Sequence, residues 1–395
     1  LGFYNFIYLD GSIRNDWSST LPADNNSFMY PAVNLAVVLS EKITIPGVTY
    51  LKVRGGYAEA GKDTRPYRLN FTYGANAPWG GLPNFTVPGA RPNNQLNPER
   101  SKSFETGLEA RFWQDRVRLD LTYYNTNTID QIIPLNVSST TGFTSRITNA
   151  GTIQNDGVEI QFGLTPVRTK DFRWDIDLNW AKNNSLVKDL PEGVSEITIN
   201  TNWGIRLVAR EGEEYGVLVG RRVKRAPDGQ IIVNEATGSP VLDVDENGSN
   251  TNFVLGSITP DWVGGIRNTF TWKGLSLSAL IDARQGSDLF SMTYVFGRFA
   301  GVLEESLEGR NTLDEVMNGY NFGGVYETVD ANGNITYSPN QVKRSAEAHN
   351  ADFYNRRHDR GVFDASFVKL REVTLGYDLP RAWFQNSFVN GLRLS

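Results

Sequence analysis

The feature that most restricts the fold is a strict alternation of side chains over residues 103–125. In the first half, Phe104, Thr106, Leu108, Ala110 and Phe112 alternate with Glu105, Gly107, Glu109 and Arg111. After a polar break at 114–116, Val117, Leu119, Leu121 and Tyr123 alternate with Arg118, Asp120, Thr122 and Tyr124. Successive side chains of a strand point to opposite faces, so the pattern predicts a hairpin with two unlike faces. Each arm has about nine residues, whereas ordinary strands have roughly 5–6 and membrane-spanning strands about 9–11.

Similar alternation recurs along the 395-residue chain. We predict further strands at 3–14, 28–40, 48–60, 151–164, 172–185, 261–272, 275–284 and 366–379, and the beginning of another at 391–395. The second arm of the hairpin is expected to reach as far as Ile132. The alternation changes phase near Arg371 and Glu372, which predicts a β-bulge. Lys273-Gly274 predicts a tight two-residue turn because glycine tolerates a positive φ.

The connections between these strands alternate between short and long. We predict irregular structure over 61–100, 186–260 and 285–363, with one short helix near 307–317. Loops of this length are improbable inside a compact soluble domain. An up-and-down antiparallel sheet would place the short turns at one rim and the long loops at the other, as in outer-membrane barrels. The pattern therefore favours an all-β, transmembrane, antiparallel up-and-down barrel with long extracellular loops.

Composition leaves one other fold open. Hydrophobic residues make up 39% of the chain and the mean hydropathy is −0.37, values that fit a barrel whose strands face lipid only at alternate positions. They also fit a soluble, surface-exposed, glycan-binding β-sandwich, in which the apolar faces would meet in a core. The chain has no run of 18 apolar residues that would predict a membrane helix.

Several function classes are disfavoured. The chain has no Cys, which excludes disulfides and thiolate metal sites, and its net charge of −5 gives no basic excess for nucleic acid. It carries no nucleophile-elbow, phosphate-loop or zinc-protease motif, and its adjacent carboxylates suggest no acid–base pair. We therefore expect no enzyme activity, cofactor or metal site.

Five segments carry a family resemblance: 51–69, 96–132, 149–162, 366–380, and 256–262 taken together with 268–290. In order and content they resemble the SusC/RagA family of TonB-dependent outer-membrane transporters of the Bacteroidetes. The resemblance implies that residues 1–395 form the C-terminal part of one plugged barrel domain of about 22 strands. Its plug, TonB box and N-terminal extension would lie outside this chain.

The same resemblance implies a function and partners. Members import oligosaccharides or peptides across the bacterial outer membrane, driven by the TonB–ExbB–ExbD complex. A SusD-like surface lipoprotein would act as a lid over the extracellular loops.

Two sets of residues are candidates for contact with a ligand. The first set is the charged side of the strands, expected to face the lumen: Glu105, Glu109, Arg118, Asp120, Arg173, Asp175 and Asp177. Cross-strand pairing and hydration of the wall would explain these charges equally well. The second set consists of loop aromatics whose flat faces could stack on sugars: Trp79, Trp203, Tyr294 and Phe296. Packing within the loops is the alternative.

Three further motifs could bind a ligand, but each also has a purely structural interpretation. Residues 243–248 begin like a calcium loop, but Val254 stands where the twelfth-position Glu should be, so a polar hairpin tip is favoured there and at 330–333. The basic segment 220–225 could meet lipid phosphates or an acidic partner, or be a solvated loop. His349 and His358 are not expected to bind a metal.

Overall fold

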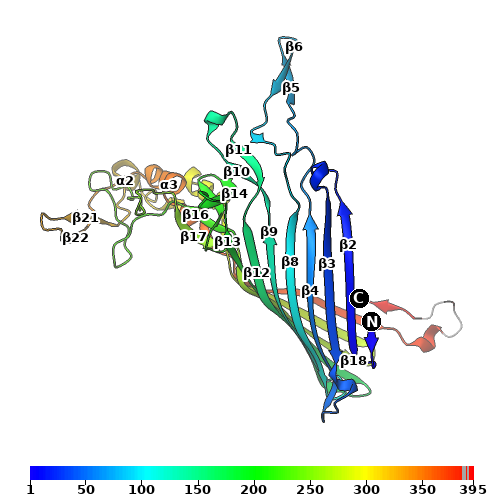
Figure 1. Cartoon of the computed structure of the whole chain (residues 1–395). Helices are drawn as coiled ribbons and strands as arrows, with labels where there is room; N and C mark the ends of the chain where they lie inside the picture. The colour runs from blue at the N-terminus through cyan, green and yellow to red at the C-terminus, as the bar shows by residue number, and fades with distance from the viewer. Residues whose placement is uncertain (385–387, 389–390) are drawn as a thin grey trace.

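The computed structural model describes every residue except 385–387 and 389–390, and its main feature is one 12-stranded antiparallel sheet (Figure 1). We call this sheet the wall; its strand order is β1-β2-β3-β4-β8-β9-β12-β13-β18-β19-β24-β25. The strands are β1 (Gly2–Phe3), β2 (Ile7–Trp17), β3 (Ser27–Val38), β4 (Val48–Lys62), β8 (Glu99–Phe112), β9 (Val117–Ile129), β12 (Thr152–Arg168), β13 (Phe172–Asp189), β18 (Pro260–Trp272), β19 (Leu275–Gly286), β24 (Phe367–Asp378) and β25 (Arg393–Leu394). Within the described residues the wall is open, with β1 and β25 at its edges.

The alternating pattern therefore predicted the wall strands in the right order, and most strands extend beyond the predicted ends. The bulge is confirmed: Leu280 pairs with Glu372 and Ile281 with Leu370, so Arg371 has no partner of its own in the ladder. The tight turn is also confirmed, because Trp272 pairs with Leu275 and both turn residues have positive φ, 45° at Lys273 and 89° at Gly274.

One face of the wall is apolar and uncovered. A single row across six neighbouring strands contains Val37, Val53, Leu108, Leu121, Ile160 and Trp180. Apolar side chains on this face are exposed, for example Val53 at 41% and Leu375 at 61%. The largest fully buried side chains instead belong to loops, helices and strand ends: Leu96, Val187, Val208, Val219, Val295 and Ser306. The β-sandwich alternative is therefore wrong, since its apolar faces would be buried against each other.

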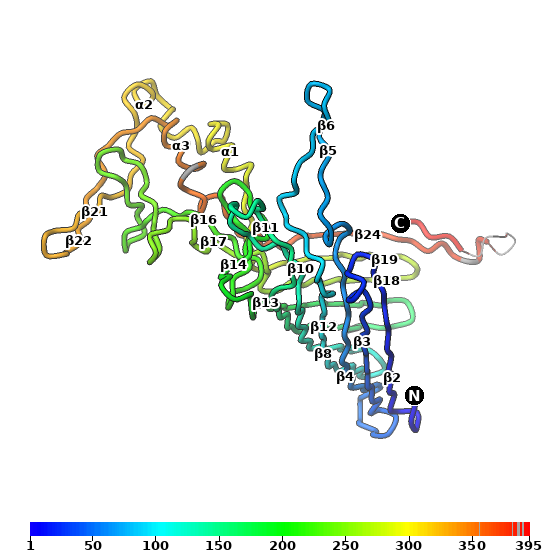
Figure 2. Tube along the Cα trace, turned by 45° about the horizontal axis from the view of Figure 1, so that its top comes forward, coloured from blue at the N-terminus to red at the C-terminus, as the bar shows by residue number. Residues whose placement is uncertain are grey.

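Short and long connections lie at opposite ends of the wall (Figure 1). Residues 113–116, 169–171 and 273–274 make the short turns, and 63–98, 130–151, 190–259 and 287–366 make the long loops. Figure 2 shows the strands turning gradually from β2 to β24, as in a twisted sheet. No helix among the described residues is long and apolar enough to span a membrane.

The long loops are more ordered than the prediction of irregular structure. Residues 61–100 contain the hairpin β5 (Gly74–Trp79) and β6 (Leu82–Thr86), and β7 (Ala90–Arg91) joins β10 (Ile132–Asn136) and β11 (Ser145–Asn149) in a small sheet. Ile132 thus belongs to a separate strand and does not continue β9. Residues 186–260 contain a four-stranded sheet of β14 (Glu196–Asn202), β15 (Ile205–Arg210), β16 (Val217–Gly220) and β17 (Phe253–Ser257).

The last long loop has three α-helices instead of the single one predicted. They are α1 (Met292–Ala300), α2 (Leu313–Asn318) and α3 (Ala346–Asn355), with the hairpin β21 (Val325–Val329) and β22 (Ile335–Pro339), the pair β20 (Asp288–Phe290) and β23 (Val362–Asp364), and 3-10 turns at Glu304–Leu307 and His358–Gly361. Each α-helix begins at a hydroxyl residue whose side chain accepts a backbone N–H of the first turn: Ser291, Thr312 and Ser345.

Residues 190–259 and 287–366 pack together into a unit that we call the loop body, visible beside the upper end of the wall in Figures 1 and 2. Its apolar centres are small, for example Val208 with Val217 and Val219, and Ala226 with Ile232 and Val325. The loop body is therefore held together by several small clusters together with polar contacts between segments.

Candidate functional site

The seven charged wall residues expected to face a lumen share one face of the wall. Glu109 pairs with Asp120, Asp120 with Gln161, and Gln161 with Asn179, so these four lie in one row. The other candidates lie at even spacings from this row on β8, β9 and β13, namely Glu105, Arg118, Arg173, Asp175 and Asp177. This face is opposite to the apolar one.

Ion pairs cross this polar face from strand to strand. Lys52 Nζ lies 2.8 Å from Glu109 Oε2, and Arg54 Nη2 lies 2.8 Å from Asp120 Oδ1. Further along, Arg118 Nη2 lies 2.9 Å from Asp177 Oδ1. Pairs of the same kind continue between Arg267 and Glu372 and between Arg371 and Asp282. Because most of these charges have a partner, the polar face has little unpaired charge with which to bind a free ion.

Glycines make the longer of these contacts possible. Arg54 on β4 passes over Gly107 on β8 to reach β9, and Arg118 on β9 passes over Gly163 on β12 to reach β13. A Cβ at Gly107 or Gly163 would lie 2.8 or 2.5 Å from the guanidinium above it. Tyr124 uses Gly157 in the same way.

In that third case the Tyr124 hydroxyl donates a hydrogen bond of 2.8 Å to Asn183 Oδ1, and a Cβ at Gly157 would lie 2.5 Å from the hydroxyl. The sequence reasoning missed this role of the glycines, and it also omitted Lys52 and Arg54 from the candidates. The signal was present in the alternation, which places all of these residues on the polar side. Only the strand register shows which glycine lies beneath which long side chain.

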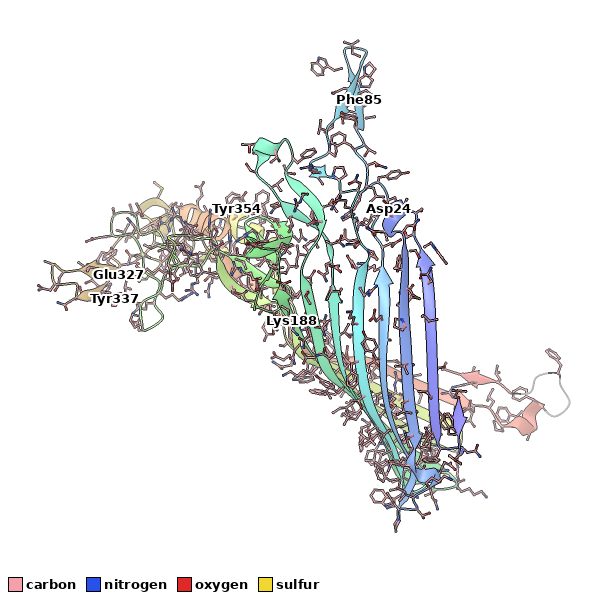
Figure 3. All side chains as sticks on the ribbon, viewed as in Figure 1. Asp24, Phe85, Lys188, Glu327, Tyr337 and Tyr354 are labelled. Atoms are coloured by element: carbon pink, nitrogen blue, oxygen red, sulfur yellow. The ribbon has the colours of Figure 1, made fainter. Side chains whose placement is uncertain are left out.

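The loop aromatics do not form a single site. Trp203 and Phe296 come together, with ring centroids 5.0 Å apart, and Tyr354 lies 5.1 Å from Trp203 and 5.5 Å from Phe296. Tyr294 instead packs 5.0 Å from Phe363. Tyr354 is labelled in the loop body in Figure 3 and was not among the sequence candidates.

Trp79 is separate from these residues. It lies at the turn of the β5–β6 hairpin, on which Figure 3 labels Phe85, and it is 84% exposed. Figures 1 and 2 both show this hairpin projecting away from the loop body. Of the four aromatic candidates, only Trp203 and Phe296 therefore lie in one cluster, which also contains Tyr354.

Both histidines are buried in the loop body and serve its packing. His349 stacks on Phe322 with ring centroids 3.7 Å apart, and burial among Arg357, Arg298 and Arg344 lowers its pKa to about 3. His358 Nδ1 accepts the backbone N–H of Arg221 at 3.4 Å, and burial lowers its pKa as well. Among the described residues, no group of three or more His, Cys, Asp or Glu side chains could hold a metal ion.

The basic and acidic loop motifs make internal contacts. In the segment 220–225, Arg222 Nε lies 2.8 Å from Asp243 Oδ2, Lys224 pairs with Glu327, and Arg225 lies 3.9 Å from Asp359. The carboxylate of Asp245 accepts backbone N–H groups within its own turn, and Asp330 does the same at the tip of the β21–β22 hairpin. The basic residues therefore tie loop segments together, whereas the two carboxylates stabilise their own turns.

Comparison with known proteins identifies this architecture. The family model described as "TonB dependent receptor-like, beta-barrel" matches residues 6–350. The chain belongs to this family. The family comprises outer-membrane transporters and receptors, so the apolar face of the wall is the face toward lipid, and the SusC/RagA resemblance is confirmed.

Relatives in this TonB-dependent receptor family cover the chain broadly. TonB-dependent receptor P26 of Formosa agariphila is 29% identical over 74% of this chain and 32% of its own length. TonB-dependent receptor SusC of Bacteroides thetaiotaomicron is 22% identical over 94% of this chain and 36% of its own length. The RagAB peptide transporter superposes with a TM-score of 0.74 at 21% identity, over 99% of this chain and 42% of that one. This TonB-dependent receptor chain thus spans about a third of the length of the curated relatives it matches.

Proposed function

We propose that this chain forms part of the barrel wall and the extracellular loops of a TonB-dependent importer of an oligosaccharide or peptide. The observation that carries the proposal is the wall itself: an exposed apolar face, an ion-paired polar face, and short turns and long loops at opposite ends. This is the arrangement that a barrel needs to hold an aqueous lumen in a membrane. In the proposal, the polar wall lines the lumen and does no covalent chemistry.

The first experiment tests energy coupling in the full-length protein that contains this chain. The segment that contacts TonB is deleted, and uptake of a radiolabelled ligand is followed in cells. We expect uptake to fall to the level of a strain lacking the protein, with the protein still present in the outer membrane. Unchanged uptake would show that the protein does not use TonB.

A SusD-like lipoprotein is proposed as the partner of the loop body. The loop body presents a broad surface at the loop end of the wall, where a lid would close an extracellular opening (Figure 1). We expect the full-length protein, extracted in mild detergent, to copurify with a surface lipoprotein encoded beside it. Removal of the β21–β22 hairpin is expected to weaken this complex. If the deletion variant retains as much lipoprotein as the wild type, the result would count against a lid.

The aromatic cluster of Trp203, Phe296 and Tyr354 is proposed as a ligand contact at the mouth of the barrel, with Tyr294 and Trp79 as secondary candidates. Trp203 is 45% exposed although it contacts two rings, so part of its face is open to a ligand. Trp203→Ala is expected to raise the KM for uptake about tenfold, a loss typical of one stacking contact. Trp272→Ala, at the turn end of the wall, is the control and should leave KM unchanged.

A further inference from the structure

The loop body contains a cleft of about 370 Å³ whose lining is rich in arginine. It lies where α1, α3, the 3-10 turn His358–Gly361 and the segment 229–240 meet. Three arginines, Arg298, Arg357 and Arg360, line it together with His349 and one carboxylate, Glu308. A volume of this size suits a small molecule or one unit of a larger one.

Two of the arginines are buried, and each has guanidinium nitrogens without a hydrogen-bond partner among the described residues. Arg298 is 3% exposed and Arg357 is 4% exposed. Nε and Nη1 of Arg298, and Nε of Arg357, are buried without an acceptor among the described residues. Buried polar groups in native proteins nearly always have a partner, so donors left open in a cleft point to a ligand that accepts from them.

An aromatic ring holds the two guanidiniums in place. Each has its Cζ 4.4 Å from the ring centroid of Phe353, a stacking contact that leaves the N–H groups at the ring edge unsatisfied. Phe353 itself is 4% exposed and lines the same cleft. The ring thus serves as a fixed platform for both cations.

Nearby carboxylates make their ion pairs with other arginines. Asp352 lies 2.6 Å from Arg344 and 3.6 Å from Arg356, and Asp359 lies 3.9 Å from Arg225. Both also act on the charge of Arg357 from a distance, although neither makes an ion pair with it within the described residues. Glu308 lines the cleft but is exposed and makes no ion pair with Arg298 or Arg357 within the described part of the chain. His349 adds no charge at neutral pH, since its pKa lies at about 3. The cleft is therefore positively charged.

We infer that this cleft binds one oxoanion group, a carboxylate or a sulfate, carried by the imported nutrient. Guanidinium groups present planar, divergent N–H donors that match the oxygens of such groups. The inference rests on the proposed import function and narrows its substrate class to acidic oligosaccharides or acidic peptides. A free inorganic anion has the same chemistry, so the experiment separates the two sources.

The binding experiment uses the full-length protein in detergent and isothermal titration calorimetry. Galactose 6-sulfate and N-acetylaspartic acid α-amide, whose only charge is its side-chain carboxylate, are titrated against their neutral counterparts galactose and N-acetylasparagine α-amide, and sodium sulfate is titrated alone. We expect at least one organic anion to bind more tightly than both its neutral counterpart and sulfate. Binding of sulfate alone would mean an adventitious ion only and would overturn the inference, as would no anion binding.

Matched variants locate the site. Arg298→Gln and Arg357→Gln should each weaken anion binding about tenfold or more, because each removes a buried charged donor. Arg298→Lys should restore part of the affinity, since it restores the charge without the planar fork. Arg356→Gln, one residue from Arg357 and outside the cleft, should bind as the wild type does. Equal weakening in Arg356→Gln would contradict a specific site.

A crystal structure of the wild type with a bound anion tests the site without relying on the folding of variants. Crystals grown with sodium selenate, an oxoanion with an anomalous signal, should show a peak beside Arg298 and Arg357. An empty cleft in such crystals would overturn the inference. The import function is tested separately, by uptake after deletion of the TonB-contact segment. That deletion is not expected to alter anion binding by the purified protein, so the two tests can fail independently.

Discussion

Arginine side chains differ in exposure and in pairing between the wall and the loop body. On the wall, Arg54 and Arg118 reach over a glycine to a carboxylate two strands away, and both members of each pair remain partly exposed to solvent. In the loop body, Arg298 and Arg357 are almost completely buried and have open donors. An exposed pair is satisfied by its partner and by water, whereas a buried unmatched cation needs an anion from outside. This difference is why we propose anion recognition in the loop body and not on the wall.

The largest expected effect contrasts a buried ion pair with an exposed one. The side chains of Arg344 and Asp352 in the loop body are 10% and 9% exposed, whereas those of Arg118 and Asp177 on the wall are 35% and 55% exposed. Arg344→Gln should destabilise the loop body by roughly 3 kcal/mol or more, because it leaves a buried carboxylate with a weaker partner. Arg118→Gln should cost about 0–1 kcal/mol. Hydrogen exchange of α3 measures the loss of stability in Arg344→Gln, and hydrogen exchange of β9 measures it in Arg118→Gln. Equal losses would contradict the expected difference between a buried and an exposed ion pair.

The next effect tests the two faces of the wall against each other. Leu121 lies on the apolar face in the middle of β9, and Gln161 lies on the polar face of β12. Leu121→Arg should destabilise the protein in lipid vesicles by about 2–4 kcal/mol, as expected for a charge placed against the bilayer interior. Gln161→Arg is the control and should cost less than about 1 kcal/mol because its side chain points toward water. Urea unfolding measures both, and a reversed order would mean that the faces have been assigned wrongly.

The two regions also differ in how far the sequence predicted them. The wall strands could be predicted because the alternation within each strand's own sequence specifies its two faces. Even the bulge at Arg371 appeared in the sequence as a change of phase. Lumen contact by the seven charged residues remains a prediction. The contacts of Arg118 over Gly163, in contrast, depend on the register of three strands, which alternation alone does not specify.

The loop body was predicted least well. Its strands and helices are short, and its segments find each other through contacts far apart in the sequence, such as Arg225 with Asp359. The helices α1 and α3 nevertheless had a local signal in the capping residues Ser291 and Ser345. The cleft at Arg298 and Arg357 had none, since the segments that line it meet only in the folded chain.

A pH change should affect the loop body through His349. Burial and the neighbouring Arg357, Arg298 and Arg344 lower its pKa from 6.5 to about 3 in the folded protein. Between these values the unfolded chain binds more protons than the folded one, so stability is present above pH 6.5 and is lost as the pH falls toward 3. From pH 7 to pH 5 the loss should approach about 2 kcal/mol, at roughly 1.4 kcal/mol per unit.

The measurement is hydrogen exchange of α3 at the two pH values. The variant His349→Phe, which retains an aromatic ring against Phe322, should flatten the dependence, although the lowered pKa of His358 leaves a residual slope. A slope as steep in the variant as in the wild type would show that His349 is not the group responsible.

The smallest effect concerns the glycines that let the wall satisfy its arginines. A Cβ on Gly163 would lie 2.5 Å from Arg118 Nη2, so Gly163→Ala must displace the guanidinium and weaken its 2.9 Å contact with Asp177. Since the displaced group is flexible and partly hydrated, the cost should be about 1 kcal/mol. Gly11→Ala, on the apolar face of β2, is the control: nothing lies within 4 Å of its added Cβ, and the gain in strand propensity should make it neutral or slightly stabilising. Unfolding midpoints in vesicles compare the two variants. If both behave alike, the glycines of the polar face serve chain flexibility alone, and the idea that they make room for cross-strand pairs fails.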